Sequence, residues 1–531
     1  MKHTGPSSPA IATRQASIKR LGTEHFDVLV VGGGITGAGV ALDAAARGLK
    51  VAIVDQTDFA AGTSSKSSKL IHGGLRYLQQ GDVALVYEAL HERQRLLRNA
   101  PHLVRMLPFM IPVLTKDGVV SRKIARALGS ALWMYDLTGG WRVGKFHRRL
   151  RAKTALTHMP TMNSDRLAAA YLYFDAEADD ARLTLAIVQS AMARGAVALN
   201  YCGVSALHKN SAGVLIGASV RTHEGDTFDV SANVVVNATG VWGDALRQMD
   251  IGGDSVTIRP AKGIHITVPW ELVQNDIAVV IPVPGDKRSL FVVPQMPNGD
   301  GTFRFTYVGT TDTDHRGAVD DPQCTQADID YCLRALNKAL DGGTSRTITR
   351  DDVVGTWAGL RPLVVASDGQ DVKGRTADLS RRHKVITSDS GMVTITGGKL
   401  TTYRKMAEHT VDAVLDSLKI SAKRCTTKRL TLHGATSRDR NDHLVSRFGT
   451  QAPAIRELIK ADASLGAPLI TGLPYLKAEA VYCARNEMVV TLEDVLSRRV
   501  RGLLYDRHAT DRKSTRLNSS HSGESRMPSS A

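Results

Sequence analysis

The feature that most constrains this 531-residue chain is a glycine-rich turn, Gly32-Gly33-Gly34-Ile35-Thr36-Gly37. An apolar run of strand length, 26–31, ends directly before it, and an alanine-rich stretch with helical spacing, 36–47, follows. A second apolar run, 51–54, stops at Asp55. A strand, a G-x-G-x-x-G turn, a helix and a second strand that ends in an acid form the unit that binds dinucleotides. The sequence therefore predicts an FAD or NAD site, and the motif alone leaves that choice open.

Each position of the motif has a mechanical reason. Gly32 permits the tight turn, Gly34 lets a pyrophosphate approach the backbone, and Gly37 lets the helix pack closely on the strand. The helix N-terminus attracts the phosphate charge, and Asp55 is placed to bind the adenosine ribose. The residues predicted to contact the dinucleotide in this unit are Gly32, Gly34, Ile35, Thr36, Gly37 and Asp55.

The rest of the chain predicts an α/β protein with a Rossmann-like domain, an antiparallel sheet and a C-terminal helical domain. Strand-like runs at 197–201, 214–221, 228–230 and 234–236 follow a helical stretch at 176–195. Short alternating runs between 256 and 308, separated by Gly, Pro and Asp, indicate antiparallel strands on the substrate side. A strand at 392–396 precedes a helix at about 401–418, and helical spacing continues from about 425 to 507.

We divide the chain accordingly into four parts. A polar lead-in covers 1–25, and an oxidoreductase domain covers 26–420. Within that domain, the dinucleotide-binding parts are about 26–115, 175–250 and 350–420, and the substrate-side sheet is about 255–350. A helical domain covers 421–510. The tail, 511–531, has no apolar periodicity, so we expect it to be disordered. Its sequence reads like an in-frame translation of a sequencing-library adapter, so we expect a non-native tail and a shortened C-terminal domain.

A second segment, 63–77, is rich in hydroxyl groups and carries two lysines, a histidine and an arginine. Composition alone is equally compatible with a solvated polar loop. Together with 309–314, 358–363 and 397–404, however, this segment resembles the FAD-dependent glycerol-3-phosphate dehydrogenases of the D-amino-acid-oxidase-like flavoprotein group. The resemblance extends from about Phe26 to Tyr505. It implies FAD as the cofactor, although Asp55 stands where relatives commonly carry Glu.

The resemblance also implies roles for individual residues. Arg361 and Arg381 match phosphate-binding arginines, and Arg76 with Tyr77 matches the lining of the substrate pocket. The remaining substrate-side positions are Thr311, His265 and Lys399. From these we predict Arg76, His265, Arg361 and Lys399 as catalytic residues, with the catalytic base unassigned. Each has a simpler alternative, since most Arg and Lys side chains are surface charges and His265 could be a core histidine.

Further flavin-binding residues follow from the resemblance alone. One group should wrap the flavin and its phosphates, a second should lie on the adenine side, and a third precedes the last helix of the domain. They are Ser65, Ser68, Lys69, Leu70, His72, Gly73 and Gly74; Ala238, Thr239, Gly240 and Trp242; and Gly398, Leu400 and Thr401.

The function that the resemblance implies is oxidation of sn-glycerol 3-phosphate to dihydroxyacetone phosphate during glycerol catabolism, with electrons passed to a membrane quinone. An oxidase that uses O2 on the same substrate is the nearest alternative. A flavoprotein that oxidises another hydroxy acid or an amine would not need phosphate-binding arginines. The net charge of +16 also allows an RNA-binding flavoprotein, but no RNA-binding module is recognisable, so we expect no nucleic-acid partner.

The stretch 122–153 interleaves nine Arg and Lys residues with leucines, two tryptophans and a tyrosine. This pattern suits the surface of an anionic bilayer, although a solvated helix face is the simpler interpretation. No apolar run is long enough to span a membrane, and the first 25 residues do not resemble a secretory signal. We therefore expect a cytoplasmic enzyme held peripherally on the inner face of the cell membrane, with a homodimer left open.

Five cysteines without a C-x-x-C pair predict no metal site.

Overall fold

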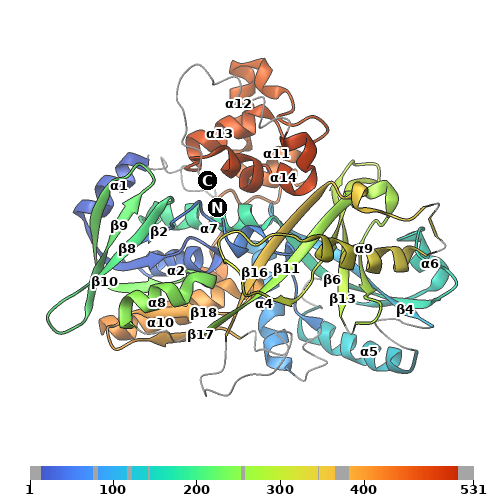
Figure 1. Ribbon diagram of the computed structural model, residues 1–531, viewed down its shortest axis with the longest axis horizontal. Coiled ribbons are helices and arrows are strands. Elements are labelled where there is room, and N and C mark those ends of the chain that lie inside the picture. The colour runs from blue at the N-terminus through green and yellow to red at the C-terminus, as the bar shows by residue number, and fades with distance from the viewer. Residues whose placement is uncertain are drawn as a thin grey trace, which may run out of the picture.

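The computed structural model describes residues 14–75, 82–115, 122–140, 144–252, 257–286, 288–341, 343–344, 346–364, 382–421 and 423–511. Figure 1 shows two sheets side by side, with the C-terminal helices lying above both. The predicted fold class is confirmed: a Rossmann-like domain, a largely antiparallel second sheet and a helical domain are all present.

The first sheet has parallel strands at its centre, as the glycine motif requires. Strands β1, β2 and β7 pair in parallel on one side, and β10 and β18 continue in parallel on the other. Two antiparallel strands, β8 and β9, extend from β10, and β17 forms an antiparallel edge. The bounds are β1 (His25–Val31), β2 (Val51–Val54), β7 (Val197–Leu199), β8 (Cys202–Lys209), β9 (Leu215–Thr222), β10 (Thr227–Asn237), β17 (Lys384–Thr387) and β18 (Val393–Thr396).

Alternate residues of β1 face two different cores. Val28 and Val30 pack with α2 (Ile35–Ala46), α7 (Asp180–Met192) and α10 (Tyr403–Leu418), whereas Leu29 and Val31 face the opposite side. That second core includes Leu21 of α1 (Arg14–Thr23), a helix within the expected polar lead-in, and Leu246 of α8 (Gly243–Ile251). Because both faces are covered, the strand is apolar from Val28 to Val31 and does not alternate there.

The second sheet is larger than the predicted range of 255–350. Its strands pair antiparallel except for β12 with β4, which are parallel. Strands β4, β6 and β16 come from stretches that the sequence assigned to the dinucleotide-binding part or left without a strand. The bounds in sheet order are β15 (Thr313–Asp314), β11 (Ile258–Pro269), β14 (Phe303–Gly309), β13 (Ser289–Pro297), β12 (Ala278–Pro282), β4 (Val104–Leu114), β6 (Leu167–Ala178) and β3 (Leu70–Ile71), with β16 (Gly355–Val364) on β11 and β5 (Arg148–Arg151) on β6.

One predicted boundary is wrong for a local reason. The helix expected from Ala176 begins at Asp180, because the Asp179 side chain accepts a hydrogen bond from the Arg182 backbone N–H and caps the helix. Residues up to Ala178 belong instead to β6, whose inward positions are buried. The helices around this sheet are α4 (Val83–Asn99), α5 (Arg122–Tyr135), α6 (Ala152–Thr157) and α9 (Gln326–Leu340).

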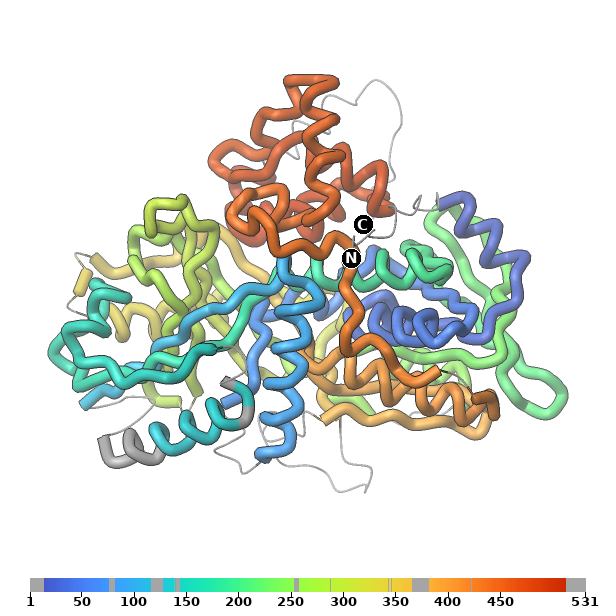
Figure 2. Tube along the Cα trace, turned by 180° about the vertical axis from the view of Figure 1, so that it is seen from behind, coloured from blue at the N-terminus to red at the C-terminus, as the bar shows by residue number. Residues whose placement is uncertain are grey.

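The C-terminal helices form a separate cluster with its own small core, which includes Phe448, Ile455 and Tyr482. Figure 2, seen from behind, shows this cluster against the junction of the two sheets, with α5 at the opposite edge of the molecule. No helix in the part of the chain that the structure describes is long and apolar enough to cross a bilayer. The C-terminal helices are α11 (His443–Phe448), α12 (Ala452–Ala461), α13 (Lys477–Asn486) and α14 (Gly502–Tyr505).

Candidate active site

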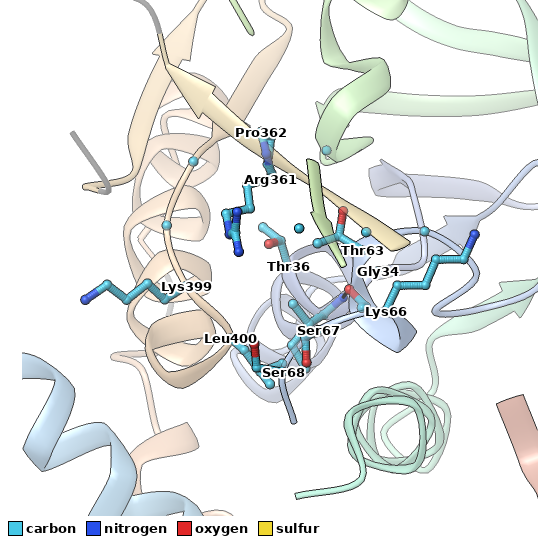
Figure 3. A pocket seen from close by; sticks show the side chains of 18 of the residues that line it. Gly34, Thr36, Thr63, Lys66, Ser67, Ser68, Arg361, Pro362, Lys399 and Leu400 are labelled. Atoms are coloured by element: carbon cyan, nitrogen blue, oxygen red, sulfur yellow. Dashed lines mark hydrogen bonds between the residues drawn. The ribbon is translucent and has the colours of Figure 1, made fainter. Parts of the chain in front are cut away.

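A cavity of about 640 Å³ lies where the two sheets meet, a volume within the range of cofactor and ligand pockets. One end is lined by the glycine turn and Asp55, and the other by His265, Thr311 and Arg361. Figure 3 shows labelled residues of both ends in one view. The cavity therefore joins the predicted dinucleotide site to the predicted substrate site.

The glycine turn is packed too tightly for any side chain at two of its positions. Gly32 has φ +106°, and a Cβ there would lie 2.6 Å from the Ala238 carbonyl oxygen. A Cβ on Gly37 would lie 1.8 Å from the Gly32 carbonyl oxygen. Gly34 begins α2 without a side-chain cap, and the first turn of that helix has no acidic residue. A positively polarised helix end thus faces the cavity.

Two polar side chains hold the turn in place. The Asp55 carboxylate accepts hydrogen bonds from Gly33 N (2.6 Å) and Thr57 N (2.8 Å), and Ser64 Oγ accepts one from Ile35 N (2.8 Å). Burial raises the pKa of Asp55 to about 6, against the opposing effect of these two amides. Ser64 lies in the hydroxyl-rich segment noted in the sequence, where composition could not indicate which hydroxyl contacts the turn.

These residues fit an FAD molecule. The α2 N-terminus suits a pyrophosphate, and Asp55 suits ribose hydroxyls. The lining also includes Trp242, His72 and residues of the second sheet. Most of the predicted cofactor residues line this cavity. They are Gly32, Gly34, Ile35, Thr36, Asp55, Ser68, Leu70, His72, Gly74, Ala238, Thr239, Gly240, Trp242, Gly398, Leu400 and Thr401.

The other four predicted cofactor residues, Gly37, Ser65, Lys69 and Gly73, lie behind the lining. Gly37 packs against the turn, and Gly73 N donates to Asp175 Oδ1 (3.1 Å). The Lys69 ammonium lies 3.4 Å from Asp180 Oδ1 and 4.6 Å from the centre of the Trp357 ring. Burial lowers the pKa of Lys69 to about 8.

Arginine side chains gather at the substrate end. Arg361 on β16 donates to Thr310 Oγ1 (3.0 Å) and the Thr311 carbonyl (3.2 Å) and lies 3.3 Å from Asp312 Oδ1. Arg288, directly before β13, donates to the Asp312 carbonyl (2.7 Å) and also lines the cavity. The sequence did not predict Arg288, because it stands alone between short strands without a motif.

His265 lies deep in the same end of the cavity. Its ring stacks on Trp357 at 4.6 Å, and Nε2 lies 2.9 Å from Ser68 Oγ. Burial, together with the charges of Lys69 and Arg361, holds the pKa of His265 well below its usual value. The ring is therefore neutral at pH 7.

Lys399 lines the cavity, but its ammonium does not join the arginines. Figure 3 shows its side chain pointing away from Arg361. Its charge is one of those that lower the pKa of Asp82, after the hydrogen bond of that carboxylate with Arg382. The other three predicted substrate residues, Arg76, Tyr77 and Arg381, lie outside the residues that the structure describes.

A further branch of the cavity is apolar. Phe109 and Ile111 of β4, Leu128 of α5, Val280 of β12 and Phe291 of β13 line it. Leu128 brings α5 into the wall of the cavity at this apolar part. The sequence did not indicate it, because residues from four separate elements form it.

Comparisons with known proteins identify the class. The family described as FAD dependent oxidoreductase matches residues 27–404, and the family described as the C-terminal domain of alpha-glycerophosphate oxidase matches residues 392–518. The chain is therefore an FAD-dependent oxidoreductase with a glycine-motif cofactor site, as the geometry above indicates.

The relatives define the family further. Glycerol-3-phosphate dehydrogenase 2 of Mycobacterium tuberculosis is 38% identical over 517 residues, which is 94% of this chain and 83% of that protein. The mitochondrial glycerol-3-phosphate dehydrogenase of Homo sapiens is 35% identical, over 92% of this chain and 69% of that protein. The crystal structure of the glycerol-3-phosphate dehydrogenase from Bacillus halodurans, complexed with FAD, aligns with a TM-score of 0.75 at 30% identity, covering 96% of this chain and 93% of that one. The chain belongs to the FAD-dependent glycerol-3-phosphate dehydrogenase family.

Proposed function

We propose that this enzyme oxidises sn-glycerol 3-phosphate to dihydroxyacetone phosphate with bound FAD and passes the electrons to a membrane quinone, as a step of glycerol catabolism. The observation that carries the proposal is the substrate end of the cavity, where the Arg361 guanidinium and the neutral His265 face one space beside the predicted flavin site. A planar guanidinium is the best side chain for a phosphate dianion.

The residues at the substrate end of the cavity have separate roles. Arg361 binds the phosphate, and Thr311, whose hydroxyl accepts from Ile264 N (3.1 Å), fixes the loop beneath it. When bound, FAD supplies the hydride acceptor for C2 of the substrate. We assign the hydroxyl proton to His265 Nε2, which now contacts the Ser68 hydroxyl, because a phosphate dianion nearby raises the pKa of a neutral imidazole. Arg76, Arg381 and Lys399 stay predictions as further substrate contacts.

The apolar branch of the cavity supports a quinone acceptor. Its lining includes Leu128, a buried residue of α5. Large apolar side chains are exposed in and after α5. They are Trp133 (56%), Leu137 (67%) and Phe146. Exposed arginines of β5 lie next to it in sequence, at Arg148, Arg149 and Arg151. Apolar side chains flanked by cations suit the surface of an anionic bilayer, and we propose that this face rests on the inner side of the cell membrane.

Anaerobic reduction tests the chemistry. The purified enzyme should lose its flavin absorbance when glycerol 3-phosphate is added, and a soluble quinone analogue should restore it within the turnover time. Glycerol, which lacks the phosphate, is the matched control and should not bleach the flavin. Rapid reoxidation by air with release of peroxide would show an oxidase instead, and a flavin that stays oxidised would refute the substrate.

Co-sedimentation with vesicles tests the surface. Reversing Arg148, Arg149 and Arg151 to Glu should abolish binding to vesicles that contain anionic lipid. Reversal of Arg316 and Lys460, two exposed cations elsewhere, is the control and should have a much smaller effect. Unchanged binding of the triple variant would contradict this docking face.

A further inference from the structure

The C-terminal helical domain contains three neighbouring arginines that are buried although they carry full charges. Arg498, Arg499 and Arg501 lie between α13 and α14, and the side chains of Arg499 and Arg501 are 0% and 1% exposed. A buried guanidinium needs several partners to offset its loss of water. The identity of those partners indicates what the arginines do.

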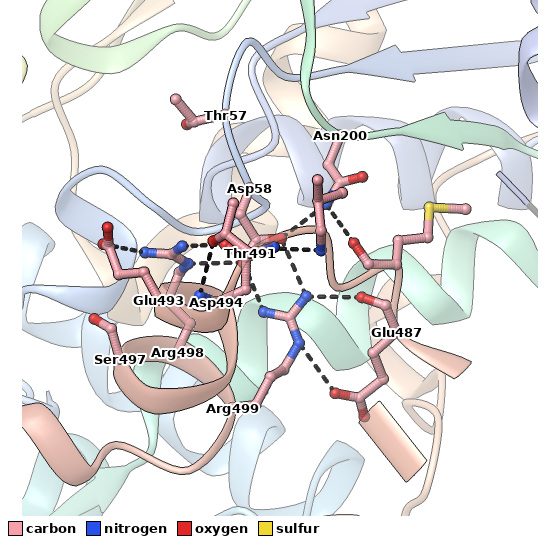
Figure 4. Close-up of polar contacts among 12 residues, drawn as sticks. Thr57, Asp58, Asn200, Glu487, Thr491, Glu493, Asp494, Ser497, Arg498 and Arg499 are labelled. Carbon is pink, nitrogen blue, oxygen red and sulfur yellow. Dashed lines mark hydrogen bonds and ion pairs between the residues drawn. The ribbon is translucent and has the colours of Figure 1, made fainter. Parts of the chain in front are cut away.

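Two of the three bind one carboxylate of the dinucleotide-binding domain. Arg499 donates to both oxygens of Asp58 (2.7 and 3.1 Å), and Arg498 Nε donates to Asp58 Oδ2 (2.7 Å). Asn200 Nδ2 adds a fourth contact to Asp58 Oδ1 (2.9 Å). Figure 4 shows Asp58 above the two guanidinium groups, with Glu487 beside Arg499. Asp58 stands three residues after Asp55, the predicted ribose ligand.

The third arginine holds the other end of the same segment. Arg501 Nη2 donates to the Ser65 carbonyl (2.7 Å) and to Asp180 Oδ1 (2.7 Å). Asp180 in turn accepts from Ser67 N and Oγ and lies near the Lys69 ammonium. The C-terminal domain therefore contacts the segment 55–69 directly at Asp58 and at Ser65.

The stretch between those two anchors forms part of the cofactor cradle. Phe59 packs beneath Gly33, where a Cβ would lie 2.4 Å from its ring, and Ser64 Oγ accepts from Ile35 N at the start of α2. Gly62 faces the Trp242 ring, and a Cβ added to Gly62 would lie 3.1 Å from that ring. The loop touches the dinucleotide turn from one side, while the arginines hold it from the other.

We propose that Arg498, Arg499 and Arg501 are positioning residues that keep the loop 55–69 in its FAD-binding shape, so that FAD affinity depends on the docked C-terminal domain. The coupling is reciprocal: bound FAD also stabilises the docked position of the arginine segment.

Titration of the full-length apoprotein with FAD, followed by flavin fluorescence, tests the proposal. R499M and R501M should each raise the Kd for FAD at least tenfold. R501K should recover only part of the loss, because the lysine side chain is one bond shorter and lacks the Nη1 donor that contacts the Ser497 carbonyl. R182M is the matched control. Arg182 binds Glu487 across the same domain interface (2.7 and 2.8 Å), and among the described residues it makes no hydrogen bond or ion pair with 55–69. Its Kd should change less than twofold.

A second measurement on the unaltered chain covers the case in which a variant fails to fold. Adding FAD to the apoprotein should slow amide hydrogen exchange in 487–501 at least severalfold, although these residues do not line the cavity. Exchange in 487–501 that is indifferent to FAD would overturn the proposal. So would wild-type Kd values for R499M and R501M, or a rise in Kd for R182M equal to theirs, since the arginines would then stabilise the fold and not the loop.

Discussion

The two ends of one cavity are built in different ways. At the dinucleotide end, a short stretch of chain supplies the Gly32–Gly37 turn, the start of α2, and the Asp55 carboxylate directly after β2. At the substrate end, single side chains converge from β11, β16 and the residue before β13. The first end is specified by backbone shape and the second by side chains that the topology brings together.

This difference predicts different responses to substitution. A backbone turn without room for a Cβ should fail as a whole, because no neighbouring residue can replace its shape. A cluster of side chains should lose function by degrees, because each member contributes a separate contact.

The largest effect is expected for G37A. The added methyl would lie 1.8 Å from the Gly32 carbonyl oxygen, so α2 or the turn must move and the phosphate site is lost. We expect the purified variant to contain no FAD by absorbance at 450 nm. The control is G22A on α1, where the added Cβ meets Phe228 at an ordinary 3.5 Å. A yellow G37A protein with full FAD content would show that the turn tolerates a side chain.

A smaller and graded effect is expected for R361A. Removing one partner of a charge-assisted contact costs about 3 kcal/mol, which lowers kcat/KM for glycerol 3-phosphate about a hundredfold. FAD content should stay unchanged, because Arg361 binds Thr310, Thr311 and Asp312 at the far end of the cavity. The kcat/KM of R361K should lie between those of the wild type and R361A, since an ammonium keeps the positive charge but lacks the planar fork of a guanidinium. Loss of FAD from R361A would show that the substrate end and the dinucleotide end of the cavity do not respond separately to substitution.

The same contrast explains what the sequence could predict. The glycine turn and its flanking strands agree with the prediction, because local chain geometry encodes them within about 30 residues. The other cofactor residues came from the resemblance and stay predictions, although most of them line the cavity. Arg288 and the apolar branch were missed, since their position depends on which strands become neighbours in the second sheet. The strand β4 was missed for a related reason. Its run contains Pro108 and Pro112, and proline normally argues against a strand inside a sheet.

Acidification should affect the two ends in opposite directions. The pKa of Asp55 is raised to about 6, so between pH 6 and 4 the folded apoprotein binds a proton more tightly than the unfolded chain does. The free energy of unfolding therefore increases as the pH decreases through this range. The pKa of His265 is held well below 6.5, so on acidification the unfolded chain binds a proton that the folded protein does not. The free energy of unfolding therefore decreases as the pH decreases. The Asp55 contribution amounts to about 1–2 kcal/mol between pH 7 and 5.

Urea unfolding of FAD-free protein at pH 7 and pH 5 measures both contributions. D55N should remove the acid stabilisation, and H265Q should remove the acid destabilisation, so the two variants should shift the difference between the two pH values in opposite senses. A variant that leaves the difference unchanged would show that its group has the same pKa in the folded and unfolded states.

The smallest effect is expected for R288Q, which sharpens the description of the substrate end. Arg288 donates to the Asp312 carbonyl (2.7 Å) and to Asp286 Oδ2 (2.7 Å), so its charge is already partly matched, whereas Arg361 has a longer contact, 3.3 Å, with Asp312 Oδ1. We expect KM for glycerol 3-phosphate to rise about tenfold, or about 1.4 kcal/mol, with kcat nearly unchanged. R304Q is the control, because Arg304 contacts the Gly472 carbonyl and does not line the cavity. If R288Q instead lowers kcat with KM unchanged, Arg288 acts on the transition state and not on substrate binding. The converging side chains would then act as a unit, and the graded response predicted for this end would be wrong.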